Sequence, residues 1–321
     1  MKNKLFIIAL VLMILLGVSK QDNVYSTSIP SAVAKNGLKE SVKVLYSGVS
    51  NVKDIFSVYY SVVPTLINKT ISIDESIFAD KYYYNQLDKR EKGIYRDIYR
   101  AYLNNSKSIS FYSSNSRVEK AFLSLTNDFP ELLWIQDYSE SISLCNVNGF
   151  MLKNKYVDDL SGNQIKAEQE ARKILETIDR SSEYSIVKGI HDYLIMNYSY
   201  SNDYAYNQGA MSSFLDKKTV CSGYARMFQY LCYLSDIECI FIFNNGHAFN
   251  QVKVDGVYYW IDVTWDDQYD DGSSKYDFIS DSYFLVSDDR INDKSHELDS
   301  VNIDYHECPY NYSDLHMMEE E

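Results

Sequence analysis

The sequence contains little proline or glycine, and basic residues are its minority charge. Its 321 residues include 4 Pro and 12 Gly, with 45% hydrophobic and 24% charged residues, a composition typical of a globular protein. The 31 Lys and Arg are outnumbered by 45 Asp and Glu, which gives a net charge of −14. Because phosphate contacts require clustered Lys and Arg, we expect no nucleic-acid partner.

Cysteine is scarce as well, and five scattered cysteines in a chain of this length do not make a disulfide scaffold. The odd number leaves at least one thiol unpaired within the chain. If 221–232 is helical, Cys221 and Cys232 lie about 16 Å apart at ~1.5 Å per residue. That separation exceeds the roughly 7 Å that a disulfide allows between Cα atoms. The five are Cys145, Cys221, Cys232, Cys239 and Cys308.

Long apolar runs are confined to the N-terminus. Lys2 and Lys4 precede the run Leu5–Val18, which is shorter than the about 20 residues of a transmembrane helix. With the small-x-small triplet 17-GVS-19, this pattern predicts a signal peptide over 1–19, and an uncleaved anchor is the alternative. No cysteine follows the run, so we expect a secreted or cell-surface protein rather than a lipoprotein. No later segment is apolar enough to span a bilayer, so we expect no transmembrane segment after signal removal.

Beyond this signal, residues 20–40 are weakly patterned and predict a linker. A mixed α/β N-terminal region is expected over 41–150, and a second domain over 151–321. The segment 131–139 is expected to begin a strand region. Apolar residues at helical spacing predict helices at 88–105, 117–127, 163–179, 183–197 and 219–234.

After residue 240 the pattern changes to one typical of strands. Segments 247–254 and 257–263 flank Asp255-Gly256, a pair that favours a two-residue type I′ hairpin turn. In that register His247 lies opposite Thr264. Asp262 then shares the face of His247, with the two backbones roughly 7–8 Å apart, close enough for an imidazole–carboxylate hydrogen bond.

Cys221 and these two residues are the components of a nucleophilic site. A helix N-terminus and a nearby imidazolium both favour the thiolate form of a cysteine, and Thr219 is a candidate cap that would place Cys221 in the first turn. A carboxylate on the far side of the imidazole fixes its tautomer. Spacing alone leaves open the alternative that Cys221 is an inert buried residue.

Three motifs, 220-VCSGYA-225, 246-GHAFN-250 and 262-DVTW-265, resemble those of the transglutaminase-like family of papain-fold thiol enzymes. The resemblance covers about 183–267, and 128-DFPELLW-134 resembles the leader before this domain in bacterial members. It implies that Cys221 is the nucleophile, that His247 is the general base and acid, and that Asp262 orients His247.

The sequence departs from the pattern at two places. Phe249 replaces the usual tryptophan, and Leu215, six residues before the cysteine, is not the glutamine of papain-type proteases. The backbone N–H of Cys221 can supply one oxyanion donor, and Tyr204 or Tyr206 is the candidate for a second. The remaining substrate-cleft candidates are Phe249 and Trp260.

Other polar residues favour structural interpretations. His296, His306 and His316 recur every ten residues, but nothing in that spacing brings them to carboxylates as a metal site requires. The acidic run 266–272 lacks the alternating ligands of a calcium loop, so a solvated loop is expected, with Ca²⁺ as an alternative that the sequence does not indicate. We therefore predict no metal and no cofactor. His191 is expected to be a structural hydrogen-bonding residue.

The resemblance and the patterns together predict an α+β fold. In its papain-like core the cysteine helix packs on an antiparallel sheet, and 151–321 is the transglutaminase-like catalytic domain. The implied function is that of an exported thiol enzyme, which transfers an acyl group from a protein or peptide amide, through a thioester on Cys221, to an amine or water. A cysteine protease or deamidase with the same residues is an alternative. A non-catalytic surface protein-binding module is another. We expect protein or peptide partners, such as cell-envelope proteins.

Overall fold

The computed structural model describes most of the chain beyond residue 70. The predicted signal peptide (1–19), the linker (20–40), Tyr204 and Tyr206 lie outside the described residues, as does most of the run 266–272. The described residues are 71–144, 147–152, 155–201, 208–244, 246–267, 279–292, 296, 298 and 303–316.

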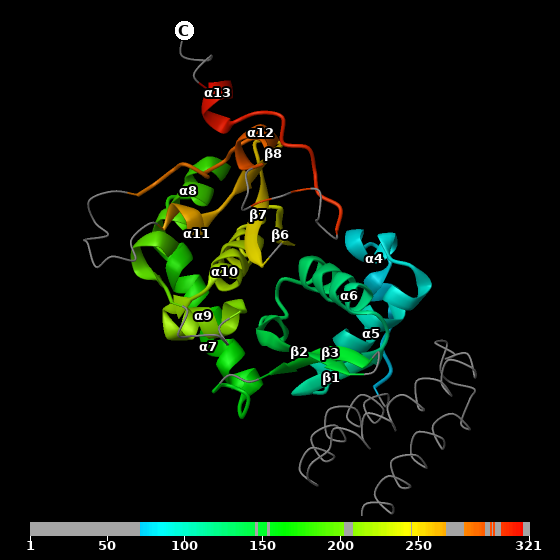
Figure 1. Ribbon diagram of the computed structural model, residues 1–321. Coiled ribbons are helices and arrows are strands. Elements are labelled where there is room, and N and C mark those ends of the chain that lie inside the picture. The colour runs from blue at the N-terminus through cyan, green and yellow to red at the C-terminus, as the bar shows by residue number, and fades with distance from the viewer. Residues whose placement is uncertain are drawn as a thin grey trace, which may run out of the picture. The chain divides into compact units, whose positions relative to one another are not determined.

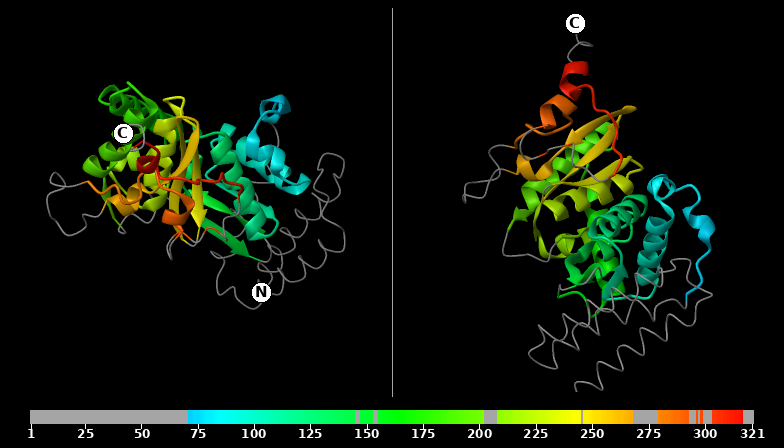
Figure 2. Two further views of the ribbon diagram at one scale, coloured as in Figure 1. Left: turned by 90° about the horizontal axis from the view of Figure 1, so that it is seen from above. Right: turned by 45° about the vertical axis from the view of Figure 1, so that its right-hand side comes forward.

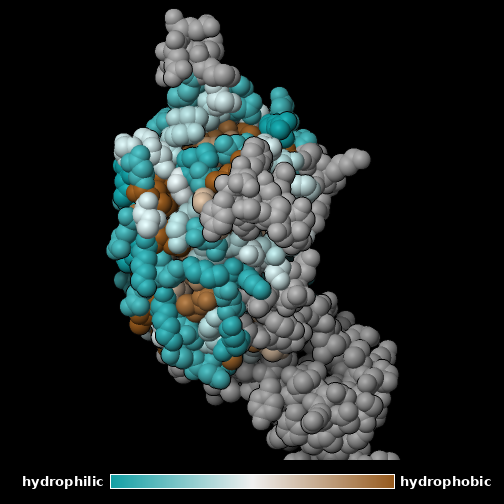
Figure 3. Space-filling model, turned by 90° about the vertical axis from the view of Figure 1, so that its left-hand side faces the viewer, coloured by the Kyte–Doolittle hydropathy of each residue, from teal (hydrophilic) through white to brown (hydrophobic). Residues whose placement is uncertain are grey.

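The chain divides into two compact units. The first consists of Met1–Ala79, Gln86–Phe122 and Ser141–Met151, and the second of Asp80–Asn85, Leu123–Glu140 and Leu152–Glu321. Among the described residues, no helix combines the length and apolar character needed to cross a membrane. On the face drawn in Figure 3, hydrophilic side chains cover most of the described surface, and apolar ones form small separate areas.

In the first unit, helix α5 (Lys89–Leu103) confirms the helix predicted at 88–105. It begins with a capping box, in which the Asp88 carboxylate accepts the Glu91 N–H and the Glu91 side chain accepts the Asp88 N–H. Strands β1 (Ser108–Tyr112), β3 (Val147–Leu152) and β2 (Tyr138–Leu144) form a sheet in the order β1-β3-β2. The remaining short helix of this unit is η1 (Glu75–Phe78), whereas α4 (Tyr82–Gln86) belongs mainly to the second unit.

The other four predicted helices are present, three of them with small shifts at their ends. Helix α8 (Glu183–Asn197) has the predicted bounds, because Ser182 caps its first turn by accepting the Ser185 N–H. The segment 131–139 forms mainly the 3-10 turn η2 (Ile135–Asp137) before β2 begins at Tyr138. The other helices are α6 (Asn115–Asp128), α7 (Leu160–Glu176), α9 (Ala210–Asp216) and α10 (Cys221–Tyr233).

The predicted hairpin forms two strands of a three-stranded antiparallel sheet in the second unit, with β7 in the centre. Strands β6 (Cys239–Asn244), β7 (His247–Val254) and β8 (Val257–Ile261) lie in that order, and Val254 pairs with Val257 as predicted. Asp255 and Gly256 have φ values of 52° and 84°, and a type I′ turn requires positive φ at both positions.

The predicted second strand is two residues too long. Strand β8 ends at Ile261, and Asp262 caps the short helix α11 (Val263–Asp266) instead of continuing the ladder. The Asp262 carboxylate accepts the N–H groups of Thr264 and Trp265, which explains why the chain turns here. His247 therefore does not lie opposite Thr264 in the ladder; its partner across the sheet is Asn244 on β6.

Helix α10 packs against this sheet, as Figures 1 and 2 show. Ala225 of α10 lies in one core cluster with Ile242, Phe249 and Trp260. Each fully buried large apolar side chain of this kind contributes about 1.5–3 kcal/mol to folding. Helix α10 is buried on all sides, since every residue from Ser222 to Cys232 is buried. The described chain is thus α+β with antiparallel sheets.

The chain after residue 279 returns to this sheet. Trp260 and Val286 exchange two backbone hydrogen bonds of 2.9 Å, which adds one rung to β8. The Trp260 indole N–H also donates to Asp288 in helix α12 (Asp288–Ile291), at 2.7 Å. These contacts bring residues 286–288, which precede His296 in the sequence, alongside β8. The remaining elements are the parallel pair β4 (Ser199–Tyr200) and β5 (Lys218–Thr219) and helix α13 (Tyr312–His316).

Candidate active site

Cys221 is the first residue of α10 and is partly exposed. The predicted cap at Thr219 is wrong, because the N-cap is Val220, which has no side-chain hydrogen bond to the helix. The Thr219 hydroxyl lies 2.7 Å from that of Ser213 instead. The first turn of α10 therefore keeps its positive end uncapped by any side chain, beside the Cys221 thiol.

The residues after Cys221 fix the start of this helix. Gly223 lies against the chain before the helix, and a Cβ there would meet the Thr219 Oγ1 at 1.8 Å and the Ser213 Oγ at 2.2 Å. Ser222 donates its hydroxyl to the Gln208 carbonyl at 2.7 Å. The small residues of the motif 220-VCSGYA-225 thus allow a close approach that positions the thiol.

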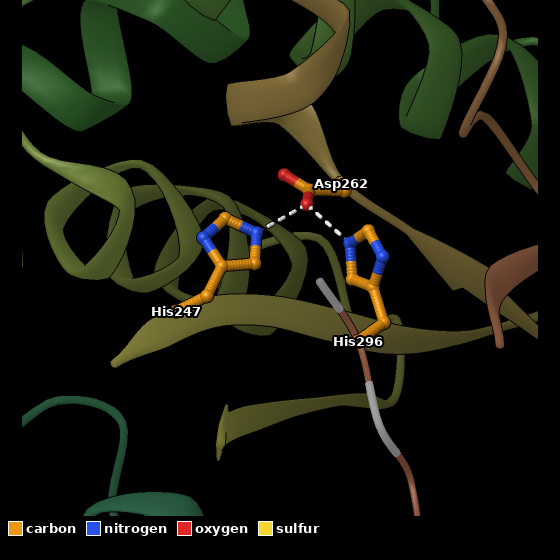
Figure 4. Close-up of side chains that lie close together, drawn as sticks. All are labelled: His247, Asp262 and His296. Carbon is orange, nitrogen blue, oxygen red and sulfur yellow. Dashed lines mark hydrogen bonds and ion pairs between the residues drawn. The ribbon is translucent and has the colours of Figure 1, made fainter. Parts of the chain in front are cut away.

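His247 begins β7 and is joined to Asp262 at the end of β8 (Figure 4). The distance from its Nε2 to Asp262 Oδ2 is 2.5 Å, and 15% of its side chain is exposed. A carboxylate is acceptor-only, so Nε2 carries the hydrogen. Nδ1 is then the nitrogen left for Cys221, whose thiol is a hydrogen-bonding neighbour of this imidazole. The structure thus brings the three predicted catalytic residues together.

Asp262 is buried and accepts four hydrogen bonds. Its Oδ1 accepts the N–H groups of Thr264 and Trp265 at 2.9 and 3.1 Å, and its Oδ2 faces His247 and His296. Burial alone would raise the pKa of this carboxyl group. The hydrogen bonds and charges of His247 and His296 outweigh burial and lower the pKa, so the group is ionised at neutral pH.

His247 is correspondingly a strong base. Burial lowers the pKa of its imidazole, but hydrogen bonds and charges from Asp262 and Cys221 raise it to about 10. The ring is therefore an imidazolium at neutral pH, and a cation beside a thiol favours loss of the thiol proton. Such a pair provides a nucleophile and a proton donor in one contact.

His296 is the residue that the sequence did not predict for this site. It is fully buried, and its Nε2 lies 2.8 Å from Asp262 Oδ2. His306 and His316 lie elsewhere, stacked on Tyr258 and Tyr312 with ring centroids 3.8 Å apart in each case. The ten-residue spacing therefore carries no information. Val286 of the apolar run 283–286 pairs with Trp260 of β8, but no local pattern in the sequence specifies this pairing.

The cleft candidates differ in exposure. Phe249 and Trp260 are buried, so they support the site from within and do not form a surface open to substrate. The Phe249 ring stacks on that of His247, with centroids 5.8 Å apart. Trp265 is 41% exposed, and its ring lies edge-on to His247 at 6.2 Å. Trp265 is thus the described aromatic side chain that can contact a substrate next to His247.

His191 takes part in a buried network beside the site. Its Nδ1 lies 2.8 Å from Asp192 and its Nε2 3.2 Å from Asp266, which joins α8 to α11. Asp266 also accepts the Ser280 hydroxyl at 2.9 Å and the Tyr283 N–H. This is the structural hydrogen-bonding role expected for His191.

The other described cysteines have no imidazole partner of this kind. Cys232 and Cys308 are fully buried, and Cys239 lies beside Cys232, where burial raises the pKa of the Cys239 thiol. Cys232 and Cys239 therefore have a packing role. Cys145 lies outside the described residues.

Two groups of side chains in the described residues have donor atoms close enough to share a cation. One is His247, Asp262 and His296; the other is His191, Asp192 and Asp281. Hydrogen bonds already join the members of the first group, and Lys188 pairs with both carboxylates of the second. A cation would have to displace those hydrogens or the ammonium group.

Comparison with known proteins finds a family match over part of the chain. Residues 171–271 match the family model described as "Transglutaminase-like superfamily". No curated protein matches the chain. A solved structure titled "Crystal structure of a TGase" is 17% identical, with a TM-score of 0.29, over 40% of this chain and 42% of that one. The chain thus spans less than half of that structure, and a likeness at this level carries no argument about activity. The match over 171–271 shows that the chain contains a domain of the transglutaminase-like superfamily, whose members are usually Cys–His–Asp enzymes.

Proposed function

We propose that the protein is a thiol enzyme that transfers an acyl group from a protein or peptide amide to an amine or to water. The observation that carries this proposal is the position of His247, which is held by Asp262 through Nε2 and has Cys221 as its other neighbour. Cys221 is the nucleophile, and His247 is the general acid and base. Asp262 orients the imidazole and stabilises its protonated form.

The first half of the reaction forms a thioester. The Cys221 thiolate attacks the amide carbon, and the carbonyl electrons move to oxygen, where the Cys221 N–H at the helix N-terminus can stabilise the oxyanion. The tetrahedral intermediate collapses, the C–N bond breaks, and the imidazolium Nδ1–H of His247 protonates the leaving amine. His247 is then neutral, with Nε2–H still donated to Asp262.

The second half restores the enzyme. An amine or a water molecule attacks the thioester carbon while Nδ1 of His247 takes its proton. The C–S bond breaks, and the electron pair returns to Cys221 as thiolate beside the regenerated imidazolium. An amine acceptor gives a crosslinked or modified amide, and water gives deamidation or proteolysis.

The acyl donor is proposed to be a glutamine side chain or a peptide amide, on the strength of the superfamily match over 171–271. Proteolysis or deamidation by the same three residues is the second candidate, because water competes with amines for any exposed thioester. Export is a further part of the proposal, supported by Lys2 and Lys4 before the apolar run 5–18. Proteins of the cell envelope would then be the substrates within reach.

One experiment separates these reactions. The full chain is incubated with a labelled primary amine and a glutamine-rich protein, beside Cys221→Ala and the matched control Cys239→Ala. We expect label in the protein with wild type and C239A and none with C221A. Ammonia release without label indicates a deamidase, and new chain termini indicate a protease. Absence of all three products in wild type would overturn the proposal and favour a binding module.

A further inference from the structure

Two histidines approach the same oxygen of one buried carboxylate. His247 and His296 lie with their Nε2 atoms 2.5 and 2.8 Å from Asp262 Oδ2 (Figure 4). His247 comes from β7, whereas His296 comes from the chain that follows α12. The two imidazole centroids are 5.3 Å apart, with their planes at 75°. His296 therefore contacts the site through the carboxylate of Asp262 and not through Cys221.

The ionised state of Asp262 requires a hydrogen on Nε2 of both rings. A carboxylate supplies no hydrogen, so His296 must donate Nε2–H just as His247 does. The other oxygen, Oδ1, accepts the backbone N–H groups of Thr264 and Trp265. Besides His247, the carboxylate of Asp262 accepts hydrogen bonds from the Thr264 N–H, the Trp265 N–H and His296. His296 is the side-chain donor among these three.

The surroundings make this hydrogen bond important. Asp262 is 1% exposed and His296 is fully buried. The His296 ring packs edge-on against Phe249 at 4.8 Å and lies 5.3 Å from the ring of Tyr283. Water is thus excluded from this side of Asp262, and in such a site an ionised carboxylate needs donors from the protein.

We propose that His296 is a positioning residue that keeps Asp262 ionised and aligned through the catalytic cycle. The inference rests on the proposed function. During the cycle His247 gives its Nδ1 proton to the leaving amine and becomes neutral, which removes the cation that compensates Asp262. The Nε2–H of His296 remains on the same oxygen, so the carboxylate keeps its charge and can stabilise the imidazolium when it forms again.

The charged and titratable groups facing this pair are few among the described residues. His247 on β7 contacts Asp262, Cys221 on α10 contacts His247, and Tyr283 lies against His296. Among the described residues, loss of the His296 donor leaves His247 as the one side chain that hydrogen-bonds Asp262. The buried carboxylate then takes up a proton more easily, and the imidazolium beside Cys221 is less stabilised.

The test measures Cys221 alkylation by iodoacetamide as a function of pH, with C221A subtracted as background. The variants are His296→Leu, His296→Gln and Asp262→Asn, with His306→Leu as the control for replacing a histidine outside the site. Gln can present its amide N–H near the Nε2 position, whereas Leu has no donor. We expect H296L to move the midpoint up by about one pH unit, a rate loss on the order of tenfold at the acidic end. H296Q and H306L should stay close to wild type.

The outcomes are distinguishable. A wild-type protein without rapid alkylation at acidic to neutral pH overturns the proposed function and the role of His296 with it. A profile that D262N shifts but H296L leaves unchanged overturns the role of His296 alone. If H296L does not fold, ¹⁵N NMR of wild type and H296Q decides: the inference requires an Nε2–H on His296 and an unchanged Nε2–H signal of His247 in H296Q. An Nδ1–H tautomer of neutral His296 would refute it.

Discussion

Gly223 and Thr219 approach each other so closely that no side chain larger than hydrogen fits between them. A Cβ on Gly223 would lie 1.8 Å from the Thr219 hydroxyl oxygen, which itself is bonded to Ser213. The contact connects the short strand β5 to the first turn of α10, which carries Cys221. The position of the nucleophile thus depends on a residue without a side chain.

Gly223→Ala is therefore expected to reduce stability by about 1–3 kcal/mol through overpacking and to slow alkylation of Cys221. Urea denaturation and the iodoacetamide rate measure the two effects. In a background of Ser213→Ala and Thr219→Ala both obstructing oxygens are gone, so the same change should cost less. Equal costs in both backgrounds would show that the close approach is not the cause.

Asp262→Asn separates the two roles of this side chain. The amide oxygen of Asn can still accept the N–H groups of Thr264 and Trp265, so α11 keeps its cap. The negative charge is lost, and we expect acyl transfer to fall by about 10³- to 10⁴-fold with a small change in melting temperature. A variant that loses stability but retains turnover would assign Asp262 to the cap alone.

The pH dependence of stability follows from His247. Its pKa rises to about 10 in the folded protein, above the unfolded value of about 6.5. The folded state thus binds the proton more tightly, so this contribution is complete below about pH 6.5 and is lost as pH rises through about 10. The difference in unfolding free energy between wild type and His247→Gln should shrink across that window. A difference that grows with pH would reverse the assigned sign.

His191 offers a test of the support around the site. His191→Leu leaves Asp266 buried without its imidazole partner, and breaking a buried pair in this way costs about 3–5 kcal/mol. Chemical denaturation measures the loss. Asp266→Asn in the same protein should recover part of it, because the unpaired buried charge is then removed. Failure of the second change to recover stability would mean that packing, not charge, dominates.

Trp265 is expected to act on substrate binding. The ring is 41% exposed beside His247, so Trp265→Ala should alter stability by less than about 1 kcal/mol and raise KM more than it lowers kcat. Tyr233→Ala is the matched control, because Tyr233 is 43% exposed at the other end of α10. Equal kinetic effects of the two variants would show that Trp265 does not contact the substrate.

Turn and capping residues in the sequence predicted the elements whose geometry depends on neighbouring residues. The turn at Asp255 and Gly256 set the register of the hairpin, and Ser182 set the start of α8. Alternation alone cannot show where a strand stops, so the switch from β8 to α11 at Asp262 was missed. The predicted proximity of His247 and Asp262 was nevertheless right, because a cap at the strand end stays on the same side of the sheet.

His296 lay beyond the reach of those rules. It is 34 residues from Asp262 in sequence, and the intervening chain has neither regular alternation nor helical spacing. Its position depends on a tertiary pairing, that of Trp260 with Val286, which no local pattern specifies. For Thr219 a local rule gave a wrong prediction. Thr219 is a good capping residue close to the start of α10, but its hydroxyl forms a hydrogen bond with that of Ser213.

The pairing of Trp260 with Val286 also determines how much of the chain must be kept together. A fragment ending at residue 271 would contain all of the region that matches the family model, including Cys221, His247 and Asp262. It would lack Val286, which pairs with Trp260, and His296, which hydrogen-bonds Asp262. One side of Asp262 would then be open to water. The smallest piece of this protein that can be expected to work thus extends past the last motif, to at least residue 296.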